Sequence, residues 1–478
     1  MNVLLVSTYD LGRQPFGLAS PAAWLREDGH WVTLADLSRQ PMPMPALGSA
    51  PDLIAFFLPM HTATRLALPV VSRLRAAYPA AHLCAYGLYA PLNAEALRAA
   101  GVKTILGGEF EQGLRDLAGD AGPLSSTRKG GGYPGGSERS HDREGVVAVI
   151  PEISLARQRF LVPDRAGLPP LSAYAQLVSG GVRRVAGHTE ASRGCKHLCR
   201  HCPVVPVYGG VFRVVQREVV LEDIRRQVAA GAEHITFGDP DFFNGPGHAM
   251  ALVEALHREW PAVTYDATIK IEHLLKHRDL LPVLKASGCA FVVSAVESLD
   301  DAVLERLAKG HTRADFEEAL RLMRAEGLAL SPTFIPFTPW TTRESYREFL
   351  RALAGLELEE QVAPIQLAIR LLVTQGSLLL ELPEVRSMIG PFDPAALTYP
   401  WRNGDAALDG LAAAAQRTVA REERSGTPRS EIFRKVWELA EAGAWPVEEP
   451  RPQHATIPYL TEPWYCCAEP EEGQFNVL

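Results

Sequence analysis

The sequence predicts an α/β protein in which two series of strands and helices follow one another along the chain. Short apolar segments alternate with amphipathic ones over residues 1–118 and again over residues 146–375, while residues 119–145 interrupt the pattern and residues 376–478 are mainly helical. Such alternation is typical of parallel sheets covered by helices. We therefore expect an N-terminal doubly wound parallel sheet, a flexible linker, a partial (β/α)6 barrel and a C-terminal helical tail.

The N-terminal series contains five apolar segments of strand length. These expected strands are Val3–Val6, Val32–Ala35, Leu53–Leu58, Leu83–Tyr86 and Thr104–Leu106. Gly, Ser and Pro then fill 14 of the 27 positions from 119 to 145. This composition cannot bury enough apolar surface to offset the entropy lost on ordering, so we expect a flexible linker here.

The second series contains six expected strands. They are His188–Ala191, His234–Phe237, Val263–Ala267, Phe291–Val296, Ala329–Phe334 and Ile365–Leu371. Apolar residues at helical spacing, such as Phe316, Leu320 and Met323, mark the helices between them. This repetition favours a parallel barrel with its chemistry at the carboxyl ends of the strands. Two more helices, Leu408–Glu423 and Ser430–Ala442, are expected beyond the barrel.

Composition and charge exclude some classes of protein. The chain has 48 basic and 56 acidic side chains, a net charge of −8, which argues against nucleic acid as the main partner because phosphate binding needs a basic surface. No apolar run is long enough to span a membrane, and the segment 1–7 reads as a strand rather than a signal peptide. We expect a cytoplasmic protein with a small-molecule partner, in which seven cysteines suit metal binding better than disulfides.

Three cysteines, Cys195, Cys199 and Cys202, lie within eight residues directly after the first expected barrel strand. Thiolates at this spacing can each bind one iron of a [4Fe–4S] cluster. The fourth iron then has no ligand from this loop, and an open position is typical of a catalytic metal site. The alternative is a zinc site completed by His197 or His201, although zinc usually takes a second Cys-x-x-Cys pair.

The Cys-x-x-x-Cys-x-x-Cys motif resembles the signature of the radical S-adenosylmethionine (SAM) superfamily. Three further segments are similar to stretches of that family, namely Gly209–Arg213, Gly238–Pro240 and Glu297-Ser298 with the later Lys309–His311. The resemblance covers residues 188–375 and implies an enzyme whose cluster reduces SAM by one electron and breaks a carbon–sulfur bond. It also implies an external electron donor such as flavodoxin or ferredoxin.

The resemblance further implies a set of cofactor-binding residues. They are Gly238, Asp239, Pro240, Asp241, Glu297, Ser298 and His201. Asp239 and Asp241 suit hydrogen bonds to SAM, while Asp241 equally suits a cap of the next helix. His201 departs from the family, which usually has an aromatic residue before the third cysteine, and this leaves the packing of the SAM adenine open.

Residues 1–118 resemble the cobalamin-binding domain that precedes many radical SAM barrels, because Leu106–Glu111 is similar to a Gly-Glu-x-Glu turn common there. Family members that bind cobalt through histidine carry Asp-x-His-x-x-Gly after the first strand, whereas Tyr9–Gln14 of this chain contains no histidine. Some members bind cobalamin without that ligand. A bound cobalamin and a scaffold without ligand therefore both remain open.

Two adjacent cysteines, Cys466 and Cys467, follow Trp464 and Tyr465 near the end of the sequence. A disulfide between neighbours would be strained, while two soft thiolates suit a thiophilic centre such as trivalent arsenic, or a redox relay. Inert tail residues are the remaining alternative. The Cys-Cys-Ala-Glu-Pro ending resembles a group of radical SAM proteins named for this tail, above all those of arsinothricin biosynthesis, which implies transfer of the 3-amino-3-carboxypropyl group of SAM to arsenite.

Three functions follow from these observations. The first is a radical SAM group transferase, with Cys466 and Cys467 as catalytic residues that hold a trivalent arsenic substrate. The second is a cobalamin-dependent radical SAM methyltransferase, in which the tail cysteines serve redox turnover. The third is a regulator without catalytic activity that binds a thiophilic metal or metalloid.

Overall fold

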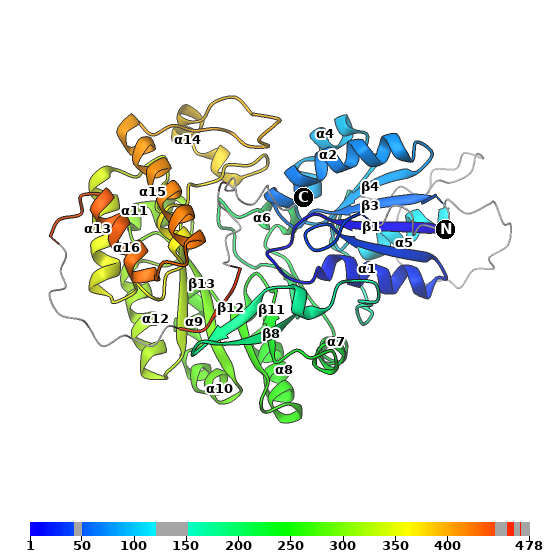
Figure 1. The fold of residues 1–478 in the computed structure, drawn as a ribbon, viewed down its shortest axis with the longest axis horizontal. Coiled ribbons are helices and arrows are strands. Elements are labelled where there is room, and N and C mark those ends of the chain that lie inside the picture. The colour runs from blue at the N-terminus through cyan, green and yellow to red at the C-terminus, as the bar shows by residue number, and fades with distance from the viewer. Residues whose placement is uncertain (43–49, 121–151, 445–456, 463–468, 470–478) are drawn as a thin grey trace.

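The computed structural model describes residues 1–42, 50–120, 152–444, 457–462 and 469. Within these residues the chain forms two mainly parallel sheets that lie side by side (Figure 1). The expected α/β architecture, with an N-terminal parallel sheet and a barrel-like sheet, is therefore confirmed. Most of the expected linker and both tail cysteines lie outside the described residues.

The N-terminal sheet has the strand order β2-β1-β3-β4-β5-β6, all parallel. Its strands are β1 (Asn2–Ser7), β2 (Trp31–Asp36), β3 (Leu53–Phe57), β4 (His82–Tyr86), β5 (Thr104–Gly108) and β6 (Ile153–Ser154). Its helices are α1 (Phe16–Glu27), α2 (His61–Ala77), α3 (Tyr89–Leu92), α4 (Ala94–Ala100) and α5 (Glu111–Asp120). All five expected strands are present.

Both faces of this sheet are covered, which explains the continuous apolar runs of its strands. Val3 and Leu5 of β1 pack in one cluster with residues of α1 and α5. Leu4 and Val6 point the other way and pack with residues of α2 and α4. Alternate side chains of one strand thus bury against different helix layers, as the period of two requires.

The second sheet has the order β14-β13-β12-β11-β8-β7-β15. Its parallel strands are β8 (Val182–Thr189), β11 (His234–Phe237), β12 (Thr264–Thr268), β13 (Cys289–Glu297) and β14 (Ala329–Phe334). Next to β8 lie two antiparallel strands, β7 (Gln176–Ser179) and, at the edge, β15 (Tyr459–Leu460). The helices that follow these parallel strands are α7 (Arg217–Ala229), α8 (Pro246–Glu259), α9 (Ile271–Lys276), α10 (Leu281–Ala286), α11 (Asp301–Arg306), α12 (Arg313–Ala325) and α13 (Arg343–Gly355).

The prediction of a sixth barrel strand at Ile365–Leu371 is wrong. The segment Pro364–Leu367 is a 3₁₀ turn, and a single bridge between Phe337 and Arg370 is what remains of strand pairing there. The side-chain oxygen of Gln366 accepts a hydrogen bond from Phe334 N (2.9 Å), so a side chain occupies the edge of β14 where a sixth strand would pair. The segment is apolar because it is buried, and burial rather than strand pairing explains its pattern.

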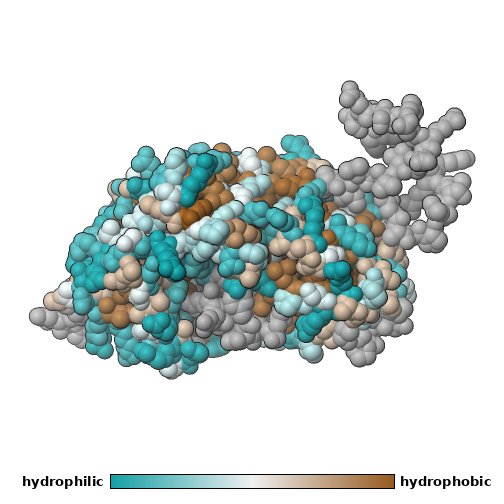
Figure 2. Space-filling model, turned by 90° about the horizontal axis from the view of Figure 1, so that it is seen from above, coloured by the Kyte–Doolittle hydropathy of each residue, from teal (hydrophilic) through white to brown (hydrophobic). Residues whose placement is uncertain are grey.

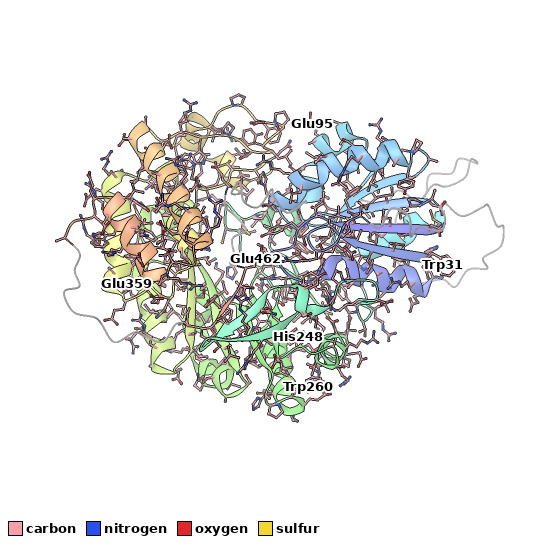
Figure 3. The ribbon with its side chains drawn as sticks, in the orientation of Figure 1. Trp31, Glu95, His248, Trp260, Glu359 and Glu462 are labelled. Atoms are coloured by element: carbon pink, nitrogen blue, oxygen red, sulfur yellow. The ribbon has the colours of Figure 1, made fainter. Side chains whose placement is uncertain are left out.

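The C-terminal helices α14 (Pro383–Met388), α15 (Ala406–Arg424) and α16 (Arg429–Leu439) include the two that the sequence predicts. Beyond them β15 returns to the barrel edge, and Glu462 lies in the middle of the molecule between the two sheets (Figure 3). The oxygen Oε1 of Glu462 accepts a hydrogen bond from the Tyr9 hydroxyl (2.5 Å), which ties the C-terminal segment to the N-terminal sheet.

The surface in Figure 2 is mostly hydrophilic, with hydrophobic residues in small separate patches. Large apolar side chains that are exposed in the described chain, such as Trp31 (80%) and Leu198 (54%), come from separate parts of the sequence. None of the helices in this part of the chain is long and apolar enough to cross a bilayer.

Candidate active site

A cavity of ≈ 260 Å³ lies where the carboxyl ends of the two sheets meet. Its N-terminal wall consists of the segments that follow β1, β3, β4 and β5, and its barrel wall of those that follow β8, β11, β12 and β13. Parallel sheets bind their ligands at the carboxyl ends of the strands. The carboxyl ends of the strands of both sheets, where ligands usually bind, therefore line one cavity.

The three expected cluster ligands, Cys195, Cys199 and Cys202, all line this cavity. Their loop connects β9 (Ser192–Gly194) to α6 (Val205–Tyr208), and the Asn244 side chain fixes its start by accepting a hydrogen bond from Lys196 N (3.1 Å). Burial raises the pKa of the Cys195 thiol, so its thiolate needs a bound cation. Three thiols converging on one cavity fit a [4Fe–4S] cluster, and their binding to iron remains a prediction.

The alternative of a zinc site on these cysteines has less support. In the described chain, the compact group of side chains that could hold one ion consists of His197, Asp241 and His273, and no cysteine belongs to it. His197 directs both ring nitrogens at carboxylates, and His201 Nε2 lies 3.1 Å from Glu297 Oε1. The two histidines that would complete a zinc site with the cysteines therefore face carboxylates instead.

Glu297 lines the cavity as an ionised carboxylate. Its oxygen Oε1 lies 3.4 Å from Lys309 Nζ and 3.1 Å from His201 Nε2. Burial alone would raise the pKa of Glu297, but the charge of Lys309 and the contact with His201 outweigh it and lower the pKa to about 2. His201 also lines the cavity, whereas Ser298 accepts a hydrogen bond from Asp300 N (3.1 Å) and borders a different pocket.

Gly238 and Pro240 line the cavity at the end of β11. A Cβ atom at Gly238 would lie 2.4 Å from His188 Nε2, so the glycine leaves room for that imidazole ring. Neither ring nitrogen of His188 has a hydrogen-bond partner among the described residues. Burial lowers the pKa of His188 well below its usual value, so the ring that borders the cavity is neutral.

Asp239 and Asp241 are not among the residues that line the cavity. Asp239 accepts hydrogen bonds from Ala191 N (2.9 Å) and from the Ser192 hydroxyl, and so holds the start of the cysteine loop. Burial raises the pKa of Asp239 to about 7. Asp241 accepts a hydrogen bond from Phe243 N (3.2 Å), which is the capping role that its position suggested. Direct contact of either carboxylate with SAM stays a prediction.

Sequence reasoning missed Lys270 and Asp10, two charged residues of the cavity. Lys270 Nζ lies 4.0 Å from Cys199 Sγ, so a positive charge is available beside the thiols. Asp10 lies half-buried on the opposite wall, and desolvation raises its pKa to about 7. Each follows the end of a parallel strand within a few residues, and that position is the signal that could have identified them.

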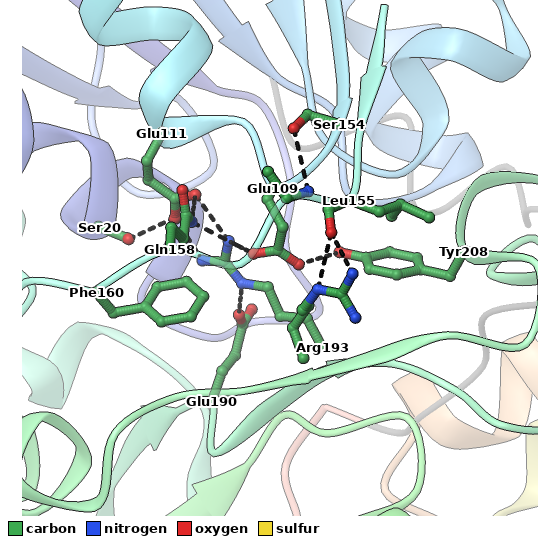
Figure 4. Close-up of polar contacts among 12 residues, drawn as sticks. Ser20, Glu109, Glu111, Ser154, Leu155, Gln158, Phe160, Glu190, Arg193 and Tyr208 are labelled. Atoms are coloured by element: carbon green, nitrogen blue, oxygen red, sulfur yellow. Dashed lines mark hydrogen bonds and ion pairs between the residues drawn. The ribbon is translucent and has the colours of Figure 1, made fainter. Parts of the chain in front are cut away.

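A buried ionic network joins the two sheets next to the cavity (Figure 4). Arg193, two residues before Cys195, contacts Glu111 Oε1 (2.6 Å), Glu190 Oε2 (2.7 Å) and Glu109 Oε2 (3.4 Å). Burial raises the pKa of Glu109 to about 7, while at Glu111 the opposing effect of burial is outweighed by Arg193 and the pKa is lowered. The Gly-Glu-x-Glu turn noted in the sequence therefore binds the base of the cysteine loop.

Comparison with known proteins identifies the barrel. Residues 189–353 match the model of the radical SAM superfamily. The chain therefore contains a radical SAM domain. The matched segment contains the cysteine loop and the strands β11 to β14, and the expected class of enzyme is thereby confirmed.

Curated relatives share part of this chain. It is similar to hopanoid C-3 methylase of Methylococcus capsulatus, with 28% identity over 151 residues, which are 32% of this chain and 29% of that protein. It is also similar to ribosomal protein uS12 methylthiotransferase RimO of Parabacteroides distasonis, with 24% identity over 194 residues, covering 37% and 43% of the two chains. The chain thus matches less than half the length of either relative.

Solved structures share the fold over most of the chain. One is OxsB, a cobalamin-dependent SAM radical enzyme with aqua-cobalamin and SAM bound, with a TM-score of 0.64, 15% identity and coverage of 87% of this chain and 66% of that one. Another is the radical SAM methyltransferase TsrM of Kitasatospora setae with cobalamin and a [4Fe–4S] cluster bound, with a TM-score of 0.55, 18% identity and coverage of 74% and 70%. These likenesses show a common fold.

Proposed function

We propose that this chain is a cobalamin-dependent radical SAM methyltransferase acting on a small molecule. One observation carries the proposal: the cavity has the three cysteines on its barrel wall and the strand ends of the N-terminal sheet on its opposite wall. A cofactor bound to the N-terminal sheet would therefore face a cluster bound to the barrel. The methylase and methyltransferase among the similar proteins support the same reaction.

The barrel wall suits a cluster with SAM. The three thiols would bind three irons, and Lys270, whose Nζ lies 4.0 Å from Cys199 Sγ, would pair with the SAM carboxylate. When bound, the cluster supplies the electron that breaks a carbon–sulfur bond of SAM. The chain itself holds the loop through Asp239 and Arg193, and keeps Glu297 charged at the rim.

The N-terminal wall suits an apolar macrocycle held without a histidine ligand. Its apolar lining residues are Leu11, Phe57, Pro59, Met60, Leu88, Tyr89 and Phe110. No histidine occurs among the residues of this wall in the described chain. The cavity of ≈ 260 Å³ is below the range of about 300–1,000 Å³ that is usual for small-molecule sites, so binding of SAM and a corrin together requires the loops at these strand ends to separate.

The proposal is tested with the full chain, reconstituted anaerobically with iron, sulfide and cobalamin. We expect one corrin per chain to remain after gel filtration, measured by visible absorption and by chromatography of the extracted cofactor. With reduced flavodoxin or ferredoxin as electron donor, SAM labelled in its methyl group should transfer label to product. A chain that retains its iron but no corrin would contradict the proposal.

A second candidate is transfer of the 3-amino-3-carboxypropyl group of SAM to arsenite held by Cys466 and Cys467. Both cysteines lie outside the described residues, but the residues on either side are anchored. Glu462 accepts a hydrogen bond from Tyr9, and Glu469 Oε2 lies 3.2 Å from Arg370 Nε. Glu462 also borders a pocket that shares lining residues with the large cavity. SAM labelled in the aminocarboxypropyl group would give labelled product with arsenite only in this second reaction.

A further inference from the structure

We propose that His197, Asp241 and His273 form a second metal site, which binds one divalent transition-metal ion beside the cysteine loop. The site is separate from the cluster and does not depend on which group the enzyme transfers. It brings together a residue of the loop, the end of β11 and the helix α9 that follows β12.

The three side chains converge on one point. One ligand atom of each lies within 4.8 Å of the other two. The same carboxylate oxygen, Asp241 Oδ2, is 2.7 Å from His273 Nδ1 and 3.5 Å from His197 Nε2. Zinc holds nitrogen and oxygen ligands at about 2.0–2.2 Å, which places tetrahedral ligand atoms about 3.4 Å apart. A small rotation of the imidazole rings therefore brings all three atoms to a shared ion.

The atoms that face one another are buried and have no hydrogen-bond partner among the described residues. They are His197 Nε2, Asp241 Oδ2 and His273 Nδ1. His273 Nδ1 and Asp241 Oδ2 are therefore 2.7 Å apart, but their geometry is not that of a hydrogen bond. Buried polar atoms are almost always hydrogen-bonded, and three exceptions at one point indicate a missing common partner. A metal ion would satisfy all three.

The surroundings also resemble those of a metal site. His197 Nδ1, the nitrogen turned away from the site, lies 3.6 Å from Glu272 Oε2. A carboxylate behind a ligating imidazole fixes its orientation and tautomer in many metal sites. The positive charge nearby belongs to Lys270, whose Nζ lies 3.5 Å from Glu272 and 4.0 Å from Cys199 Sγ and so is engaged outside the triad.

The donor set defines the class of ion. Two imidazoles and one carboxylate suit zinc, iron(II) or a similar divalent transition metal, whereas calcium and magnesium prefer oxygen ligands alone. Three protein ligands leave room for water. Because His197 lies between Cys195 and Cys199, the ion would fasten the cysteine loop to the ends of β11 and β12.

The test uses the full chain carrying its reconstituted cluster, with zinc as the probe. After incubation with zinc and gel filtration, we expect one zinc per chain in addition to the cluster iron, counted by mass spectrometry of the metals. X-ray absorption at the zinc edge should show imidazole and oxygen ligands and no sulfur at about 2.3 Å.

Variants of the triad separate this site from the cysteines. Asp241→Asn keeps an oxygen to accept the Phe243 N–H but removes the charged ligand, and should weaken zinc binding at least tenfold, as should His273→Ala. His277→Ala is the matched control, because its ring lies 5.9 Å from that of His273 but it is not part of the triad. This variant should bind zinc like the unaltered chain.

Two results would overturn the proposal. One is a chain that retains no zinc, which would leave the triad as a cluster of polar side chains only. The other is zinc bound through sulfur, or bound equally by Asp241→Asn, which would place the ion on the cysteines. Neither result depends on corrin binding or label transfer, so failure of this site is distinguishable from failure of the proposed reaction.

Discussion

Replacing Arg193 with methionine should destabilise the protein and loosen the cysteine loop. The change keeps an unbranched apolar stem but removes the guanidinium, which contacts Glu111 (2.6 Å), Glu190 (2.7 Å) and Glu109 (3.4 Å). Arg193 is 6% exposed, and the side chains of Glu109 and Glu111 are 1% and 0% exposed, so water cannot readily replace the guanidinium at these two carboxylates. Removing one partner of a buried ion pair costs about 3–5 kcal/mol, because it leaves charge uncompensated. We expect a loss in this range at pH 8.

The loss should depend on pH. Without Arg193, three carboxyl groups near one another would have their pKa values raised above the unfolded value of about 4.3. A carboxyl group whose pKa is raised on folding stabilises the protein fully below its unfolded pKa, and this contribution is lost as the pH rises through the folded pKa. The difference between Arg193→Met and the unaltered chain should therefore shrink as the pH falls from 8 toward 5.

Denaturant unfolding of the chain at both pH values measures this difference, and iron retention after reconstitution reports on the loop. Arg115→Met is the control, because Arg115 also contacts two carboxylates, Glu27 and Asp28, but at the surface, where an ion pair contributes about 0–1 kcal/mol. Adding Glu111→Gln to Arg193→Met should restore part of the loss. A loss equal to that of the Arg115 variant, or one independent of pH, would refute the reasoning.

Three further predictions follow from the site. Changing any of the three loop cysteines to alanine should remove most of the iron and abolish SAM cleavage, while Cys84→Ala in the N-terminal sheet should keep its iron; unchanged iron in the loop variants would exclude the cluster. Glu109→Gln should flatten the pH dependence of stability between about pH 4.3 and 7, because the raised pKa of Glu109 makes its favourable contribution to stability disappear over that range, by roughly 4 kcal/mol in all. Denaturant unfolding at pH 5 and 7 measures this, and an unaltered slope would contradict it. The double variant Cys466→Ser/Cys467→Ser should retain its iron and cleave SAM but form no arsenic product if the second candidate reaction operates, and product formed at the normal rate would show that the tail cysteines are not needed.

The sequence pattern was sufficient to predict those features that depend only on residues close together in the sequence. The strands of the N-terminal sheet and the barrel follow from apolar runs of the right length, and the cysteine motif follows from spacing alone. The expected strand at 365–371 failed because its pattern reports burial, and a side chain, Gln366, occupies the strand edge. A buried turn and a buried strand produce the same run of apolar residues in a short segment, so the sequence alone does not distinguish them.

Contacts between distant residues could not be read from pattern. Arg193 and Glu111 are 82 positions apart, so neither residue indicates its partner, although the Gly-Glu-x-Glu turn marked one side of the pair. The same holds for His197 and His273. His197 lies in the loop that follows β8 and β9, and His273 lies in α9 after β12, and they meet because β8 and β12 both flank β11 in the sheet. Asp239 and Asp241 show the converse, since their position indicated a site but the structure directs Asp239 to the loop backbone.

The anchors of the cysteine loop explain why the two sheets form one functional unit. Asp239 holds the loop from within the barrel, whereas Glu109 and Glu111, which hold Arg193, belong to the N-terminal sheet. A barrel without that sheet would keep Arg193 buried against Glu190 alone and would lose two of the three carboxylates that orient the strand before Cys195. A shift of Glu109 or Glu111 would therefore act on the loop through this network. The network thus connects the N-terminal wall of the cavity to the strand that precedes the cysteines on the barrel wall.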